Sequence, residues 1–278
     1  MKQVCAMLFA AVVVCGCSPS ERDELRLYVF DCGWARLATR VPFGIADHES
    51  DVRHGAYPCY MIEHPQGRLL WDGGVASEVA QTAGWLEALP GFLWIRLDRT
   101  LAEQLADIGL TLDSLDYVAF SHMHWDHVGI ANELPGGTLI IQQAEYDAAF
   151  ADQVTVPAFD TAAYAGLRNM PRRTITGDHD VFGDGRVRII STPGHTPGHQ
   201  SLLLELAETG TVLLSGDVYH SPTHRELRRM PVFNVDSAQS LESMRRVEAL
   251  LQEVGAQLWI HHDSTLFATL RKAPAYYR

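Results

Sequence analysis

The chain carries the segment HMHWDH at residues 122–127, which places three imidazoles and one carboxylate within six residues. The apolar run 117–120 precedes it and predicts a short strand that ends just before the first histidine. Imidazole nitrogens bind borderline divalent cations at about 2.0–2.1 Å, so these side chains on one tight loop can converge on a metal. A single histidine at such a junction is usually a hydrogen-bonding residue, but this density predicts a metal site. Its candidate ligands are His122, His124, Asp126 and His127.

Three later segments also place histidine or aspartate where a predicted strand ends. They read STPGHTPGH at 191–199, LSGD at 214–217 and IHHD at 260–263. Each of them follows a short apolar stretch that predicts a strand.

These motifs, in this order, resemble the metallo-β-lactamase-like hydrolase superfamily, whose signature is H-x-H-x-D-H. The resemblance implies that His195, Asp217 and one residue of the pair His261-His262 complete the ligand set. We choose His262, because lactonase-type members of the family place this ligand immediately before an aspartate. The implied assignment has three parts: one ion held by His122, His124 and His195, a second held by Asp126, His127 and His262, and Asp217 between the two.

The resemblance covers nearly everything after residue 24 and implies an α/β (α+β) fold. The expected architecture is an αββα sandwich, with two mixed β-sheets packed face to face and helices outside. Local patterns predict strands and helices in meanders rather than in strict alternation, which agrees with that architecture. Strands are expected at 25–31, 57–63, 68–71, 117–120, 138–142, 186–191, 201–206, 211–214 and 257–260, helices at 97–109, 144–150 and 236–254, and a long loop at 33–55.

Segments 27–31, 58–62 and 70–74, with the pair His262-Asp263, resemble the N-acyl homoserine lactonase branch. The resemblance implies opening of the lactone ring of N-acyl homoserine lactones, known as quorum quenching. A hydroxide that bridges the metals would attack the ring carbonyl while Asp126 moves the proton. The predicted cofactors are two divalent metal ions, with Zn²⁺ expected first and Fe, Co or Mn compatible with the same ligands.

Other functions remain as alternatives. The same centre fits a broader lactone, ester or phosphotriester hydrolase and, with less support, a β-lactamase. A metal-binding protein without catalytic activity is disfavoured by the complete ligand set. An oxidoreductase of the flavo-diiron type is disfavoured because the chain has neither a carboxylate-rich iron motif nor a flavodoxin-like segment.

Several positions concern the chemistry around the ligands. Many lactonases carry a tyrosine three residues after the bridging aspartate, where this chain has His220. We predict that His220 replaces it as a hydrogen-bond donor to the substrate carbonyl; a histidine without catalytic role is the alternative. Asp72 matches a family carboxylate that orients a ligand imidazole, with a surface-turn aspartate as the alternative. The remaining histidines of interest are expected to have structural, packing or solvent roles: His179, His199 and His261.

The N-terminal residues predict export. Residues 4–15 form an apolar run too short for a permanent span, which is typical of a secretory signal. The segment VCGC at 14–17 resembles a bacterial lipobox, with cleavage before Cys17. The predicted organisation is a signal peptide at 1–16, a lipidated cysteine and tether at 17–24, and one hydrolase domain at 25–278. The product would be a membrane-anchored lipoprotein of the periplasm or cell envelope, with an ordinary signal peptide as the alternative.

Composition limits the partners. A net charge of −12 argues against nucleic acid. The expected partners are a small-molecule acyl lactone and the membrane through the lipid anchor, and a homodimer is compatible with the sequence. Cys32 and Cys59 remain after processing, and an oxidising compartment permits a disulfide between them, although two separate buried thiols are equally ordinary. Candidates for an apolar groove are Trp34, Val41, Pro42, Phe43, Ile45, residues 91–95, Tyr146, Phe150 and Phe159.

Overall fold

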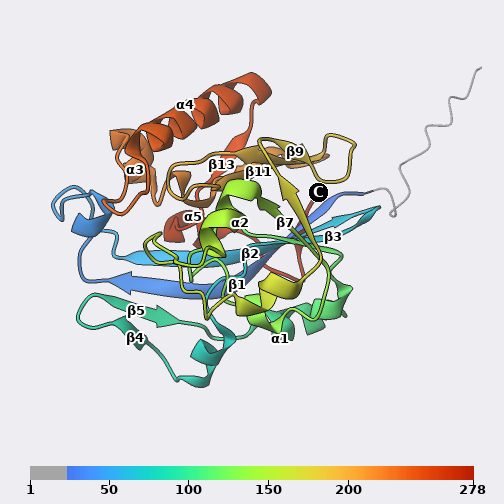
Figure 1. Cartoon of the computed structure of the whole chain (residues 1–278), viewed down its shortest axis with the longest axis horizontal. Helices are drawn as coiled ribbons and strands as arrows, with labels where there is room; N and C mark the ends of the chain where they lie inside the picture. Colours follow the sequence, from blue (N-terminus) through green and yellow to red (C-terminus); the bar gives the residue numbers. More distant parts are fainter. Residues whose placement is uncertain (1–23) are drawn as a thin grey trace, which may run out of the picture.

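Two β-sheets lie face to face and carry helices on their outer sides in the computed structural model (Figure 1). The structure describes residues 24–278, so the predicted signal peptide, Cys17 and nearly all of the predicted tether lie outside it. The predicted fold class, a sandwich of two mixed sheets, is confirmed. Within residues 24–278, no helix is long and apolar enough to cross a membrane.

The first sheet has nine strands and combines antiparallel with parallel pairing. Its strands are β1 (Arg26–Leu37), β2 (His54–His64), β3 (Gly67–Trp71), β4 (Leu86–Leu89), β5 (Leu93–Arg96), β6 (Tyr117–Ala119), β7 (Thr138–Gln142), β8 (Arg172–Ile175) and β14 (Tyr276–Tyr277). β1, β2 and β3 form an antiparallel meander, whereas β3, β6, β7 and β8 run parallel. The hairpin predicted around residues 64–67 is therefore confirmed.

The second sheet has five strands. They are β9 (His179–Asp180), β10 (Val187–Ser191), β11 (Gln200–Leu206), β12 (Gly210–Leu214) and β13 (Gln257–Trp259). All neighbours are antiparallel except β12 and β13, which run parallel. The carboxyl ends of β12 and β13 therefore meet at one edge of this sheet.

Side chains alternate between the inner and outer faces of the sheets, as the period of a strand requires. Leu204 of β11 points into the layer between the sheets, whereas Leu203 packs toward the outer helix α4 (Ser237–Val254). On the first sheet, Leu69 faces the inner layer and Leu70 faces the outer cluster. The two sheets thus share one core, and α4 packs on the outer surface of the second sheet.

The predicted helices are found close to their expected positions, but one of them differs in length. They are α1 (Leu101–Ala106), α2 (Gln143–Ala149), α3 (Pro222–Leu227), α4 and α5 (Ser264–Thr269). Asp236 caps α4 as predicted, because its side chain accepts two backbone N–H groups. The helix predicted at 97–109 is too long: Thr100 and Glu103 form a capping box that begins α1, and Leu97 packs in the core instead.

The prediction of a loop over residues 33–55 is wrong for its first part. β1 continues to Leu37, and its register shifts between Asp31 and Trp34. This irregularity breaks the alternation that reveals a strand, so the pattern after Asp31 could not be recognised. The hairpin of β4 and β5, which pairs with the extended part of β1, was also missed, and its own register shifts between Glu87 and Leu89 (Figure 1).

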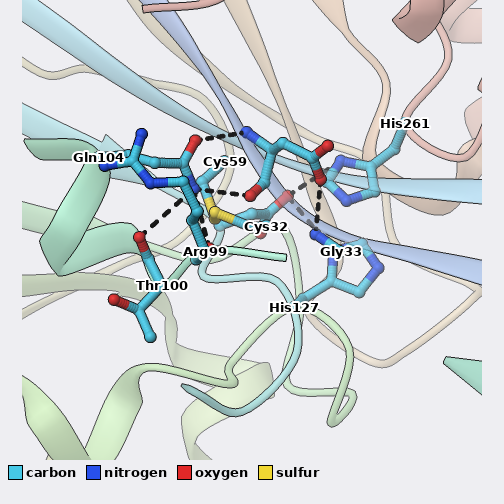
Figure 2. The surroundings of a disulfide bond; sticks show 10 residues. Cys32, Gly33, Cys59, Arg99, Thr100, Gln104, His127 and His261 are labelled. Carbon is cyan, nitrogen blue, oxygen red and sulfur yellow. Dashed lines mark hydrogen bonds and ion pairs between the residues drawn. A yellow bond between two sulfur atoms is a disulfide. The ribbon is translucent and has the colours of Figure 1, made fainter. Parts of the chain in front are cut away.

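Cys32 and Cys59 form a disulfide between β1 and β2, with their Cα atoms 5.7 Å apart (Figure 2). The sequence alone left this pairing open. Beside it, the Gln104 side chain accepts the N–H of Asp31 at 3.1 Å and donates to its C=O at 2.7 Å. Gly74 leaves room for this arrangement, since a Cβ there would lie 2.3 Å from the Cβ of Cys32. The bridge therefore ties β1 to β2, and the turn after β3 packs closely against its Cys32 end.

We expect reduction of the disulfide to lower the free energy of unfolding. The two cysteines are 27 residues apart, and a closed loop of that size stabilises a fold by about 3–4 kcal/mol in the chain-entropy model. Denaturant unfolding with and without a reductant measures the difference. The Cys32→Ser/Cys59→Ser double variant is the control, because its unfolding should not respond to the reductant. Equal stability of the original chain in both conditions would contradict the prediction.

Candidate metal centre

The candidate ligands lie on loops that leave neighbouring strand ends. His122, His124, Asp126 and His127 follow β6 of the first sheet, and Asp217 and His262 follow β12 and β13 of the second. His195 lies in the turn between β10 and β11. Because both sheets direct these loops to the same edge, all seven side chains meet in one place.

The first group brings three ring nitrogens together. His124 Nδ1 lies 2.8 Å from His122 Nε2 and 3.0 Å from His195 Nε2. Two ligands that each bind one ion at about 2.0–2.1 Å lie roughly 3 Å apart, so these spacings are those of a shared ion. Asp217 Oδ2 completes the group at 3.4 Å from His195 Nε2 and 3.8 Å from His122 Nε2. These four side chains could therefore hold one metal ion.

The second group forms around the other oxygen of the same aspartate. Asp217 Oδ1 lies 3.1 Å from His262 Nε2 and 3.4 Å from His127 Nε2. Asp126 Oδ2 lies 3.8 Å from His262 Nε2, and the three side chains Asp126, His127 and His262 could hold a second ion. Asp217 thus lies between the two groups, and His262 Nε2 is near both of its oxygens, 3.1 Å from Oδ1 and 3.3 Å from Oδ2.

Burial and polarity show that these residues fit metal ions. His127 Nε2 and Asp217 Oδ1 are buried and have no hydrogen-bond partner within residues 24–278. A buried polar atom without a partner is costly, and a bound cation would satisfy both. Burial lowers the pKa of His195 to about 3 and the pKa values of His122 and His124 well below their ordinary range. Their rings are therefore neutral near pH 7, which is the form that binds metal.

Two of the ligand rings, those of His127 and His195, are oriented through the nitrogen that does not face the metal groups. Asp72 Oδ1 accepts the N–H of Ser121 at 2.6 Å, while its Oδ2 lies 3.3 Å from His127 Nδ1. The structure thus places Asp72 where the sequence prediction put it, fully buried and directed at a ligand ring. His195 Nδ1 lies 2.8 Å from the side-chain oxygen of Asn234. Such contacts fix the tautomer of a ligand and raise its basicity.

The other histidines differ in how near the centre they lie. His199 is buried, and its Nε2 accepts the backbone N–H of Asp217 at 2.8 Å, so it supports the central aspartate. His261 is buried and stacks on the ring of His127 at 4.4 Å between centroids. His179 pairs with Ile189 in the second sheet, outside the groups of potential ligands found in residues 24–278.

Sequence reasoning missed Glu145, which connects two ligand loops. Its carboxylate accepts the N–H of Met123 at 2.9 Å and the N–H of Gly198 at 2.7 Å. Burial raises the pKa of Glu145 to about 7 despite these contacts. Gly198 is needed for this approach, because a Cβ there would lie 2.4 Å from the backbone nitrogen of Glu145. In the sequence, Gly198 indicated a position where two chain segments come close. It did not indicate that the other segment contains Glu145.

His220 lies at the centre, as the sequence suggested. Its Nε2 is 3.0 Å from Asp217 Oδ2, and its ring packs against Phe43 at 5.4 Å between centroids. Burial lowers the pKa of His220 to about 4, so the ring is neutral at ordinary pH. With Asp217 and His262 it forms a further group that could contact a metal.

A cavity of about 350 Å³ opens beside the two groups. Asp126, Asp217, His220 and His262 lie in its wall, and the rest of the wall is largely apolar. The apolar residues that form most of that wall come from separate parts of the chain: Leu37, Pro42, Phe43, Leu89, Phe92, Leu93, Trp125 and Phe233.

The predicted groove residues are thus partly right. Pro42, Phe43, Phe92 and Leu93 line the cavity. Tyr146, Phe150 and Phe159 instead pack against the outer apolar cluster of the first sheet, and Trp34 packs against Phe267 in the core. Sequence alone could not separate these groups, because core and pocket use the same apolar side chains.

The chain is similar to known proteins along most of its length. The family model described as the Metallo-beta-lactamase superfamily matches residues 52–254. The N-acyl homoserine lactonase AttM of Azorhizobium caulinodans is 32% identical over 243 residues, which cover 84% of this chain and 89% of that protein. The N-acyl homoserine lactonase AiiA of Bacillus thuringiensis subsp. kurstaki is 27% identical over 222 residues, or 78% of this chain and 85% of that one.

Solved structures of N-acyl homoserine lactone hydrolases are also similar to this chain. An N-acyl homoserine lactone hydrolase with the product N-hexanoyl-L-homoserine bound at its catalytic metal center is 25% identical, with a TM-score of 0.75. The match covers 90% of this chain and 98% of that one. An AiiA variant from B. thuringiensis with N-decanoyl-L-homoserine at its active site is also 25% identical, with a TM-score of 0.76 over 90% and 98% of the two chains.

We expect Asp217→Ala to reduce the bound metal from two ions per chain to one or none, because both groups lose a ligand oxygen. Elemental analysis of the purified proteins after dialysis measures the content. Asp152→Asn is the matched control, since this exposed aspartate lies outside the candidate metal groups. Unchanged metal content in Asp217→Ala would show that this residue does not hold the ions.

Proposed function

The chain belongs to the metallo-β-lactamase superfamily, and we propose that it is a metal-dependent hydrolase that opens the lactone ring of N-acyl homoserine lactones. The resemblance to this superfamily and to its lactonases is confirmed by the relatives it matches. The observation that carries the proposal is the convergence of seven ligand-type side chains around Asp217, at the wall of a largely apolar cavity. A neutral ring on a long apolar tail suits such a cavity.

The proposed cofactors are two Zn²⁺ ions, with the ligands assigned to them as in the two groups above. Imidazole and carboxylate donors with short spacings suit zinc, although other divalent ions of this series bind the same donors. Two such ions supply Lewis acidity, which polarises a carbonyl and makes a nearby water molecule more acidic.

The protein side chains position the reacting groups. Asp126 is the least buried of the seven ligands and lies in the cavity wall, so its carboxylate can take a proton from water and return it to the departing ring oxygen. His220 Nε2 lies at the same wall, within reach of a carbonyl placed over the centre. The apolar wall excludes water from the rest of the substrate and leaves the ring at the polar end.

We expect the zinc-loaded protein to open N-acyl homoserine lactones faster than alkyl esters, phosphotriesters or a β-lactam, measured as proton release. Asp126→Asn should lower kcat by about 10²–10⁴-fold, the usual contribution of a positioned acid or base. The exposed Asp152→Asn serves again as the control. A protein that hydrolyses phosphotriesters or simple esters better than every acyl lactone would support the broader hydrolase instead.

The role of His220 is tested separately. His220→Ala should lower kcat by about 10²–10³-fold with little change in KM, because a donor to the developing oxyanion acts mainly in the transition state. His220→Tyr should recover most of the activity, since a phenol O–H can donate in the same place. Normal turnover in His220→Ala would remove His220 from the mechanism.

We further propose that the protein is exported and anchored by lipid on Cys17. The N-terminal motif that supports this lies outside the described residues. The Cys32–Cys59 disulfide supports export independently, because such bridges persist in oxidising compartments. A homodimer remains a proposal that rests on the sequence alone.

A further inference from the structure

Arg40 is a buried cation in the wall of the cavity. It is 3% exposed and lies in the loop between β1 and β2, next to the cavity residues Pro42 and Phe43. Its Nε donates to the carbonyl of Val52 at 2.6 Å, and one terminal nitrogen donates to the carbonyl of His54 at 3.3 Å. These bonds hold the loop, but they use only part of the guanidinium, which has five N–H donors.

The charge of Arg40 has no anionic partner in the described part of the chain. No carboxylate of residues 24–278 lies within 4.0 Å of its guanidinium. The nearby charges are those of Arg53 and Asp263, and burial, with a smaller effect from Arg53, lowers the pKa of Arg40. The carboxylate of Asp47, which accepts the backbone N–H of Arg40 at 3.3 Å, forms its ion pair with the side chain of Arg53 at 3.1 Å. Buried arginine is rare without a partner, because the lost hydration must be replaced.

The position of Arg40 in the cavity wall limits which group of a bound ligand could pair with its guanidinium. Outside the metal centre, Arg40 is the one charged side chain in the wall within residues 24–278, and most of its neighbours there are apolar. A ligand that places its reactive ring at the metal groups must run past these residues with its remaining atoms. Arg40 lines this largely apolar cavity, and the guanidinium donors that it does not use on Val52 and His54 favour an acceptor oxygen carried on an apolar chain.

We propose that Arg40 binds a carbonyl oxygen of the acyl arm, and so makes the site selective for acylamino lactones over lactones with a plain alkyl chain. This inference rests on the proposed lactonase function. The oxygen belongs to the amide, or to a 3-oxo group where the substrate has one, since both place the same acceptor chemistry near the ring. Arg40 is thus a specificity residue that contacts substrate but not the reacting atoms.

The test compares kcat/KM of the original chain and Arg40→Met on three probes. They are N-octanoyl homoserine lactone, its 3-oxo derivative, and γ-decalactone, which has the ring and an alkyl chain but no amide. We expect the preference for the acyl homoserine lactones over γ-decalactone to fall by about 10- to 100-fold, mainly through KM, as for loss of a hydrogen bond to a charged group. A similar loss for both acyl probes assigns the amide oxygen, and a loss confined to the 3-oxo probe assigns the 3-oxo group.

Control variants and the γ-decalactone probe separate a loss of substrate recognition from a loss of structure. Turnover of γ-decalactone by Arg40→Met reports an intact centre, and Arg40→Lys should keep part of the preference because it retains a cationic donor. Arg53→Met, which removes the neighbouring, partly buried cation of the Arg53–Asp47 ion pair, should leave the preference unchanged. An equal loss on all three probes, or no loss on any, would overturn the assignment of Arg40 while the lactonase proposal stands. Inactivity of the original chain on every lactone would overturn both.

Discussion

The carboxylate of Asp217 is the group on which the rest of the site depends. Its two oxygens face two different sets of imidazoles, with Oδ2 toward His195 and Oδ1 toward His127 and His262. A buried carboxylate is stable only when its surroundings supply positive charge or donors. His199 accepts the backbone N–H of Asp217 and so holds the main chain from which this carboxylate extends.

Neither sheet supplies the metal centre alone, because the candidate ligands come from both. The first sheet supplies the HMHWDH loop after β6, and the second supplies Asp217 and His262 after its parallel pair β12 and β13. The shared apolar layer between the sheets fixes the distance between these loops. Glu145 then joins the first loop to the turn that carries His195 through two backbone N–H groups. Packing and polar contacts thus hold the ligand loops in place.

The sequence predicted those residues of the site that stand in short, recognisable motifs. The ligand residues stand in short motifs after apolar runs, so their convergence could be expected from sequence and family resemblance, and the structure brings all seven together. Glu145 and Arg40 could not be found in this way. Glu145 lies in the first turn of an ordinary helix and Arg40 lies in a loop without period. What makes each notable is that its charged side chain is buried, which the local sequence does not reveal. The β4–β5 hairpin was hidden because its short strands do not alternate clearly.

The most direct test of the account is anomalous diffraction from crystals of the protein loaded with zinc. The account predicts two peaks about 3.5–4 Å apart, one among His122, His124 and His195 and one among Asp126, His127 and His262, with Asp217 between them. A single peak, or peaks that do not contact both oxygens of Asp217, would contradict it.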